Sequence, residues 1–301
     1  KGDVIMAITA SLVKELRERT GAGMMECKKA LEETNGDIEV AIENMRKSGQ
    51  AKAAKKAGRI AADGVIKVAI SADGKSAAMV EVNCETDFVA KDENFQSFAD
   101  AIANRALNSD VADVEALVAL PLHEGEATTI EEARQALISK IGENMTVRRM
   151  VRFSTAGVLS SYLHGNRIGV VVDTDQNADL GRDVAMHVAA VNPVCIDESG
   201  VPAELLEKER EIVVTQAQES GKPADIIEKM VEGRMRKYLA EITLVGQAFV
   251  KDPDTTVGKL LSSSGVTLNS FNRFEVGEGI EKKSENFRDE VMAQAAAARG
   301  E

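Results

Sequence analysis

Apolar residues near the start of the chain recur every three or four positions, which is the spacing of one face of an α-helix. The pattern predicts three short helices, over Ser11–Arg19, Met24–Glu33 and Asp37–Lys47. Glycine-containing breaks at 21–23 and 35–36 separate them. The apolar positions within the helices, including Met25 and Leu31, are expected to form a small core. The lysine-rich segment Lys52–Lys56 that follows is interpreted as a solvated connector, with nucleic-acid contact as a minor alternative.

The middle of the chain contains one pattern twice: two apolar runs around a tight turn, followed by a helical period. In the first copy the runs are Gly64–Ile70 and Met79–Val82, the turn is Asp73-Gly74, and the helix continues through Ala101. In the second copy the runs are Gly157–Leu163 and Ile168–Val172, the turn is His164–Asn166, and the helix covers Leu180–Ala190. Asp-Gly and Gly-Asn between apolar runs indicate β-hairpins. Because each sheet would leave one face exposed, helices must cover it. The pattern therefore predicts an α+β fold with two packed subdomains.

The last third of the chain returns to a helical period. Residues 203–239 predict a helical hairpin that turns at Gly221-Lys222-Pro223. A strand over Ser270–Val276 is expected to return to the sheet, and a final amphipathic helix is predicted over Asn286–Ala298.

Composition narrows the function. The 301 residues carry a net charge of −12, and an acidic surface repels phosphates, so direct binding of nucleic acid is not expected. The 3 cysteines are scattered and form no CxxC pair, which suits a reduced cytosolic chain. No apolar run reaches membrane-spanning length and no signal-peptide pattern is present, so a soluble cytoplasmic protein is predicted.

Signals of enzymatic chemistry are few. The chain has 3 histidines, and no nucleophile elbow, phosphate-binding glycine loop or metal-ligand spacing, so no cofactor, metal or catalytic residue is expected. His187 lies on an apolar helical stretch and is interpreted as a core residue in preference to a ligand. Gly277-Glu278-Gly279 is interpreted as a turn, because acidic neighbours disfavour phosphate.

A corner between a strand and a helix carries the most specific signal. Thr86-Asp87-Phe88-Val89-Ala90 follows a strand and precedes a helical period that starts near Phe95. Thr86, Asp87 and Asp92 are all candidate N-caps. With no Trp, 2 Tyr and 8 Phe in the chain, an aromatic ring beside a carboxylate at a corner is notable. The alternative is that Phe88 folds back against the helix as a hydrophobic staple.

Four segments together resemble the bacterial translation elongation factor Ts family. They are Thr86–Ala90, Leu12–Leu31, His164–Val170 and Arg273–Ile280, and the resemblance runs from about Met6 to the C-terminus. Members of that family are guanine-nucleotide exchange factors for elongation factor Tu, a GTPase. The resemblance thus implies a protein that binds Tu·GDP and promotes GDP release by disrupting the Mg²⁺ and phosphate site, without covalent chemistry.

The resemblance assigns roles residue by residue. Asp87 and Phe88 are the intruding pair that dislocates Mg²⁺, framed by Thr86 and Val89. The residues expected to contact the partner are Arg17, Met24, Met25, His164, Gly165 and Val250. At least one of the two methionines is also expected in the helical core, and a buried strand position is the alternative for Val250. Ala248 stands where the family usually has Pro, so that loop is expected to be less rigid.

The resemblance also implies the domain organisation. The expected units are a ubiquitin-associated-like three-helix domain at 7–58, a core subdomain at 59–153, a second core subdomain at 154–275 with the helical hairpin at about 203–240 as an inserted antiparallel coiled coil, and a C-terminal module at 276–301 that touches the partner. Residues 1–6 are expected to be a non-native or mis-assigned extension, because Lys1–Ile5 has no counterpart in the family. A dimer of the Tu–Ts pair is one possible assembly, and a non-catalytic scaffold or chaperone-like partner of Tu is the alternative function.

Overall fold

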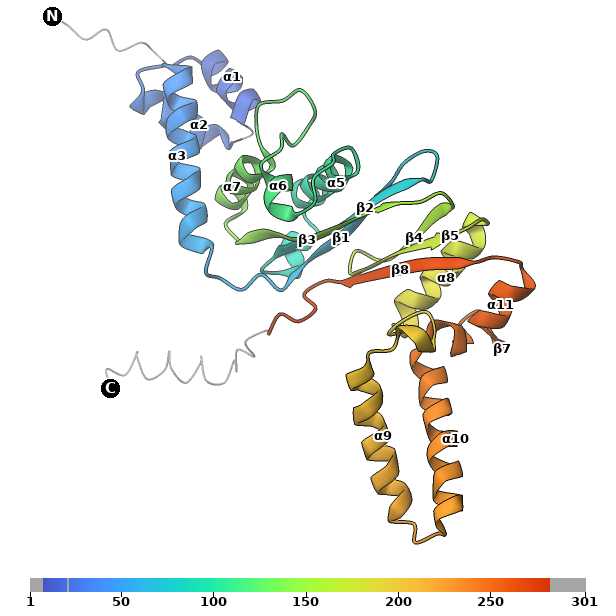
Figure 1. Cartoon of the computed structure of the whole chain (residues 1–301). Helices are drawn as coiled ribbons and strands as arrows, with labels where there is room; N and C mark the ends of the chain where they lie inside the picture. Colours follow the sequence, from blue (N-terminus) through green and yellow to red (C-terminus); the bar gives the residue numbers. More distant parts are fainter. Residues whose placement is uncertain (1–7, 21, 282–301) are drawn as a thin grey trace, which may run out of the picture.

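The computed structural model describes residues 8–20 and 22–281. Three helices at the N-terminal end are followed by two three-stranded sheets with helices outside them, and a long helical hairpin projects from the second half (Figure 1). The arrangement is an α+β fold, as the sequence predicts. The final helix expected over residues 286–298 and the expected extension at residues 1–6 lie outside the described residues.

The three N-terminal helices form as predicted, with one core of their own. They are α1 (Ala10–Thr20), α2 (Met24–Glu33) and α3 (Ile38–Lys56). Leu16 and Leu31 are fully buried between them together with Cys27. Met25 is 75% exposed, so its assignment to the core is wrong: the buried face of α2 is formed by Cys27, Ala30 and Leu31.

The lysine-rich segment is the last part of α3, so its interpretation as a connector is wrong. Alanine and lysine both favour helix, and the pattern therefore continues to Lys56. Ala53 is buried in the core below the first sheet, and the Lys56 ammonium donates a hydrogen bond to the Gly142 carbonyl at the end of α7 (Ile130–Ile141). The end of α3 thereby fastens the N-terminal helices to the rest of the molecule.

Both predicted hairpins are present, and each gains a third strand. The first sheet has the order β1–β2–β3 and the second β4–β5–β8, all antiparallel. Their bounds are β1 (Asp63–Ile70), β2 (Ser76–Cys84), β3 (Met145–Ser154), β4 (Val158–His164), β5 (Ile168–Thr174) and β8 (Leu268–Glu275). Gly74 in the first turn has a φ of +69°, a conformation that glycine adopts without strain.

The two sheets face each other, because side chains alternate along each strand. On β2, Val80 points to the helices on the outer face and Met79 to the opposite sheet. On β5, Val172 points to the helices on the outer face and Val171 to the first sheet. Gly169 lies where a Cβ would stand 2.4 Å from the Ile66 Cγ2 atom, so only glycine permits this close approach. Helices thus cover one face of each sheet and the other sheet covers the second.

The outer helices differ between the two halves. The first sheet is covered by α5 (Glu93–Leu107), α6 (Val114–Val118) and α7, and the second by α8 (Ala178–Val191) and α11 (Val257–Ser263). A two-stranded ribbon, β6 (Ala248–Phe249) and β7 (Asp252–Thr256), precedes α11. Each half therefore contains a hairpin followed by a helix, which is the repeat that the sequence predicts.

The helical hairpin consists of α9 (Ala203–Gln218) and α10 (Ala224–Ile242). Figure 1 shows the pair projecting from the body of the molecule, joined by the predicted turn, in which Gly221 has a φ of +65°. Val213, Ala217 and Val231 form its buried seam. A seam this small leaves most of the hairpin surface exposed.

A buried carboxylate ties the end of β8 to the first sheet. Glu81 on β2 is fully buried on the side of the opposite sheet, and its oxygens lie 3.1 Å from Arg148 Nη1 and 2.5 Å from Arg149 Nε. The backbone N–H of Gly277 donates to the same carboxylate at 2.8 Å. Gly277 has a φ of +73° and begins a turn, as predicted for residues 277–279. The segment that follows β8 is thus held against β2 and β3.

The four domain boundaries expected from the sequence stay a prediction. The buried residues do fall into separate clusters: one within α1–α3, one under the first sheet, one between the sheets, one under the second sheet and one in the hairpin. The cluster between the sheets contains residues of both predicted core subdomains. The two halves therefore share buried surface.

Candidate functional site

The corner after β2 is built from two consecutive helix caps. Thr86 is the N-cap of α4 (Asp87–Ala90), and its hydroxyl accepts the Val89 N–H at 3.4 Å. Asp92 is the N-cap of α5 and accepts the N–H groups of Asn94 and Phe95. The sequence predicts both caps, whereas Asp87, the third candidate, occupies the first position inside α4. The two caps turn the chain sharply enough to present α4 at the surface.

The ring of Phe88 lies in solvent. It is 81% exposed, whereas its neighbour Val89 is only 7% exposed and packs on the core below the first sheet. The staple alternative for Phe88 is therefore wrong. An aromatic side chain of about 150 to 250 Å² leaves much apolar surface in water, which is typical of residues that are covered by a partner.

Asp87 is exposed beside the ring. Its carboxylate lies 2.6 Å from Lys91 Nζ, one turn further along the chain. The hydrogen bond from Lys91 holds the pKa of Asp87 below its ordinary value, so the group is ionised at neutral pH. An ion pair between exposed groups is weak, and Asp87 can therefore exchange Lys91 for a donor on a partner.

The thiol of Cys84, at the end of β2, is not a candidate nucleophile. Burial, reinforced by the negative charge of Glu143, raises its pKa to about 12. The thiol donates a hydrogen bond to the Thr86 carbonyl at 3.2 Å and so supports the corner from below. A thiol in this state is unreactive at neutral pH.

Three of the expected contact residues lie on the N-terminal helices. Met24 and Met25 are 60% and 75% exposed at the start of α2, and Arg17 is exposed on α1. Neither methionine belongs to the core, contrary to the expectation for at least one of them. Two adjacent exposed methionines form an adaptable apolar patch.

His164 and Gly165 lie at the tip of the β4–β5 hairpin. Both are exposed, Gly165 has a φ of +57°, and the His164 Nδ1 atom lies 3.3 Å from the Tyr162 hydroxyl. The tip is held against β1, because Ile66 donates its N–H to the Asn166 carbonyl at 2.8 Å. Since the first residue of β1 pairs with Cys84, the hairpin tip and the corner lie toward the same end of the first sheet.

Val250 lies in the turn between β6 and β7, far along the chain from the other candidates. It is 39% exposed, so the alternative of a buried strand residue is wrong. Its N–H donates to Nδ1 of His187 at 3.3 Å, and the other ring nitrogen of His187 lies 2.9 Å from Gln247 Oε1. Because a backbone N–H can only donate, Nδ1 is the acceptor and Nε2 carries the proton. His187 is fully buried, as expected, and fixes the backbone that carries Val250.

Burial lowers the pKa of His187, against the opposing effect of its hydrogen bond to Gln247. Its folded pKa is therefore below the unfolded value of about 6.5, and stability is lost as pH falls below that value and the unfolded state takes up the proton. We expect the free energy of unfolding to fall with decreasing pH between 7.5 and 5.5 by up to about 1.4 kcal/mol per pH unit more than in His187→Asn. Urea titrations at the two pH values measure the difference.

His123→Gln is the control for that experiment, since His123 is exposed on a loop. Its free energy of unfolding at pH 7.5 is expected to stay within about 0.5 kcal/mol of the wild type. Equal losses of stability in the wild type and in His187→Asn would contradict the assignment of a neutral buried imidazole.

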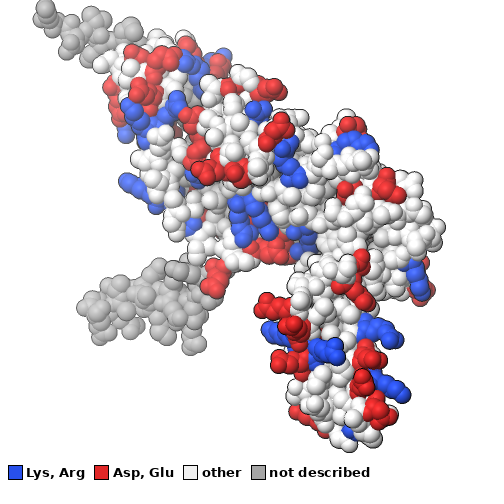
Figure 2. Space-filling view, viewed as in Figure 1, with Lys and Arg blue, Asp and Glu red and all other residues white. Residues whose placement is uncertain are grey.

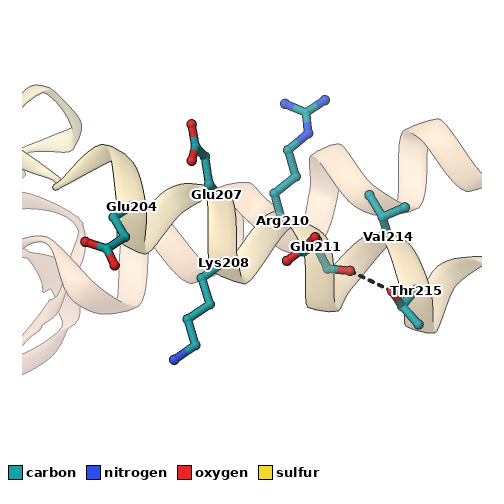
Figure 3. A pocket seen from close by; sticks show the side chains of 7 residues that line it. All are labelled: Glu204, Glu207, Lys208, Arg210, Glu211, Val214 and Thr215. Atoms are coloured by element: carbon teal, nitrogen blue, oxygen red, sulfur yellow. Dashed lines mark hydrogen bonds between the residues drawn. The ribbon is translucent and has the colours of Figure 1, made fainter.

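The described part of the chain offers little for binding a small molecule. A hollow of about 560 Å³ lies along α9, but Figure 3 shows its charged side chains pointing in different directions. Among residues 8–20 and 22–281, no group of three or more His, Cys, Asp or Glu side chains is placed to hold a metal ion. On the face shown in Figure 2, acidic and basic side chains are interspersed over the hairpin.

No helix in the described ranges is long and apolar enough to cross a membrane.

Comparison with known proteins gives consistent findings. A family profile described as Elongation factor TS matches residues 85–278. A protein of Thioalkalivibrio sulfidiphilus named Elongation factor Ts is 65% identical over 296 residues, covering 97% of this chain and 100% of that protein. Proteins of the same name from Methylococcus capsulatus and Hydrogenovibrio crunogenus are 61% and 60% identical, covering 97% and 98% of this chain and 100% of each relative.

Proposed function

This chain belongs to the elongation factor Ts family, and on that premise we propose that it binds elongation factor Tu in its GDP form and accelerates GDP release, so that GTP can load. The observation that carries the proposal is the Phe88 ring, 81% exposed beside the ionised Asp87 on a rigid corner. Exchange of this kind needs no covalent step, because a protein that binds the open state of the GTPase more tightly shifts it toward release.

The chemistry of the target makes this corner a suitable wedge. Mg²⁺ at a nucleotide site requires near-octahedral oxygen ligands, and small displacements of those ligands remove its contribution. An acceleration of about a thousandfold corresponds to about 4 kcal/mol of preferential binding to the open state. One aromatic anchor that becomes buried in the partner, together with an adjacent carboxylate, is of that order.

The remaining contact residues are proposed to hold the partner while Asp87 and Phe88 displace its Mg²⁺ ligands. They are Arg17 on α1, Met24 and Met25 on α2, His164 and Gly165 at the tip of the β4–β5 hairpin, and Val250 in the turn between β6 and β7, and all six are exposed. Binding is reciprocal: the factor weakens GDP binding as much as GDP weakens binding of the factor. An excess of GTP then drives the cycle forward.

Release of a fluorescent GDP analogue tests the proposal. Purified elongation factor Tu is loaded with the analogue and mixed with excess unlabelled GDP, with and without catalytic amounts of this chain. We expect acceleration by about a thousandfold. Binding without acceleration would refute exchange and favour the alternative of a non-catalytic scaffold.

A further inference from the structure

The carboxylate of Glu143 lies directly beneath the corner that carries Phe88. Its Oε2 atom accepts the backbone N–H groups of Glu85 and Thr86 at 3.2 and 3.1 Å. Its Oε1 atom accepts the Thr86 hydroxyl at 2.6 Å. One side chain from the loop between α7 and β3 therefore satisfies three donors at the end of β2, 57 and 58 positions away in the sequence.

A second carboxylate makes the reciprocal contact. Glu85 Oε1 accepts the backbone N–H of Asn144 at 2.5 Å, and Glu85 Oε2 lies 2.7 Å from Arg59. Glu143 thus caps the exit of β2 while Glu85 caps the entrance of β3. The side-chain amide of Asn144 donates to the Arg59 carbonyl at 2.8 Å, so the segment after α3 joins the same network.

The corner depends on this support because it has little of its own. Helix α4 has only four residues, fewer than a helix needs for independent stability, and Val89 is its one buried side chain. Its orientation is set by the cap residue Thr86, whose hydroxyl donates to Glu143 and accepts from Val89. A displacement of Thr86 therefore moves the residues that follow it, Asp87 and Phe88.

We propose that Glu143 is a positioning residue for nucleotide exchange: it fixes Thr86, and through Thr86 the direction in which Asp87 and Phe88 are presented. This inference rests on the exchange function proposed above. The partner is contacted by α4, and Glu143 acts on it only through the cap.

Substitutions of Glu143 that remove or keep its hydrogen bonds test whether it positions Thr86. Glu143→Ala removes all three acceptor contacts. Glu143→Gln keeps the connectivity, because its amide oxygen can accept the two N–H groups while its NH₂ donates to the Thr86 hydroxyl oxygen, which has one lone pair besides the one that accepts the Val89 N–H. Glu143→Asp, which shortens the reach by one methylene group, replaces the alanine variant if that does not fold. Glu124→Ala, at an exposed loop position of the same half, is the matched control.

The experiment is GDP release in a single turnover, with the chain in increasing excess over fluorescent-GDP-loaded Tu. The plateau rate reports how well a bound factor opens the site, and the half-saturating concentration reports binding and the folded fraction. For Glu143→Ala, or for Glu143→Asp in its place, we expect the plateau to fall about tenfold with the half-saturating concentration within about twofold of the wild type. Glu143→Gln is expected to recover most of the plateau, and Glu124→Ala all of it.

The outcomes distinguish this inference from the function on which it rests. A wild-type chain that binds Tu without accelerating release overturns the exchange function itself. An active wild type with an unchanged plateau in Glu143→Ala overturns only the role of Glu143. A variant in which the half-saturating concentration rises while the plateau stays unchanged also overturns it, because that result is what loss of folded protein alone would produce.

Discussion

Phe88→Ala is expected to lower the rate of GDP release by about thirtyfold or more while leaving the fold intact. The ring is 81% exposed in the free chain, so its removal takes almost no contact from the core, and the free energy of unfolding should change by no more than about 0.5 kcal/mol. In the complex proposed above the same ring would be an aromatic anchor, and truncation of such anchors costs about 2 kcal/mol or more, which corresponds to about thirtyfold in rate. Stopped-flow release of fluorescent GDP and urea denaturation measure the two effects.

Ile212→Ala is the matched control. Ile212 is another exposed apolar side chain, at 43%, but lies on α9 outside the proposed contact surface. It should leave both the release rate and the stability near wild type. If Phe88→Ala binds Tu normally and releases GDP as fast as the wild type, the wedge lies elsewhere on the molecule.

Glu81→Ala is expected to lower the free energy of unfolding by about 1.5 to 3 kcal/mol, because it removes the buried, charged acceptor of two partly exposed guanidinium groups and of one backbone N–H. Arg148 and Arg149 both pair with this carboxylate, and the Gly277 N–H would lose its acceptor. The Arg149 guanidinium would keep its hydrogen bond to the Glu275 carbonyl at 3.0 Å, its ion pair with Glu278 at 3.2 Å and its stacking on the Phe274 ring, 4.1 Å from the centroid. Urea denaturation gives the loss directly.

The contribution of Glu81 to stability should also depend on pH. Burial opposes ionisation of Glu81, but the hydrogen bonds from Gly277, Asn83 and Arg149 outweigh it and hold its pKa below the ordinary value. Its contribution is therefore present above the unfolded pKa of about 4.3 and is lost as pH falls from there through the folded pKa. Between pH 5 and pH 3, Glu81→Gln should consequently lose less stability than the wild type.

The exposed pair Arg152–Asp110, 3.5 Å apart on β3 and the loop before α6, is the control for Glu81. Because both groups are accessible to water, Asp110→Ala should change stability little. A Glu81→Ala protein that unfolds at the same urea concentration as the wild type would show that the buried cluster contributes nothing.

Elements with a strong local signal could be predicted from the sequence. The helix α2 was expected over Met24–Glu33 and has those bounds, and both hairpin turns were identified by their Asp-Gly and Gly-Asn pairs. The caps at Thr86 and Asp92 are equally local, because the side chain that accepts and the backbone N–H that donates lie within three residues of each other. In these places propensity, capping and apolar period agree.

The period of apolar positions assigns no element to residues 145–154, which form β3. Its sequence contains Arg148, Arg149 and Arg152, and their charges interrupt the alternation that marks a strand. Arg148 and Arg149 on β3 both pair with Glu81, which is buried on β2. The register of the β2–β3 pairing also shifts between Glu81 and Val82. Only the folded arrangement shows that these charges have a partner.

The candidate site, too, is predictable only where its signals are local. The position of residues 86–90 between a strand and a helix predicts a corner, but it leaves open whether Phe88 is exposed or folds back; in the structure Asp87 and Phe88 are the exposed residues of this segment. Glu143 holds Thr86 from 57 positions away, and His187 holds the backbone of Val250 from 63 positions away. No local sequence pattern reveals contacts at such separations. The prediction for Met25 is wrong because the helical period alone does not say which apolar positions of α2 face inward: Cys27, Ala30 and Leu31 are buried and Met25 is not.

The order of the second sheet has a consequence for how the chain is made. Its central strand β5 begins at residue 168, but its edge strand β8 begins at residue 268. At a synthesis rate of about 5 to 20 residues per second, β5 waits roughly 5 to 20 seconds on the ribosome for its second neighbour. The first sheet has all three strands by residue 154 and can form during that interval. We therefore expect the nascent second sheet to expose an unpaired edge until β8 has been synthesised, which makes this half the more dependent on chaperones.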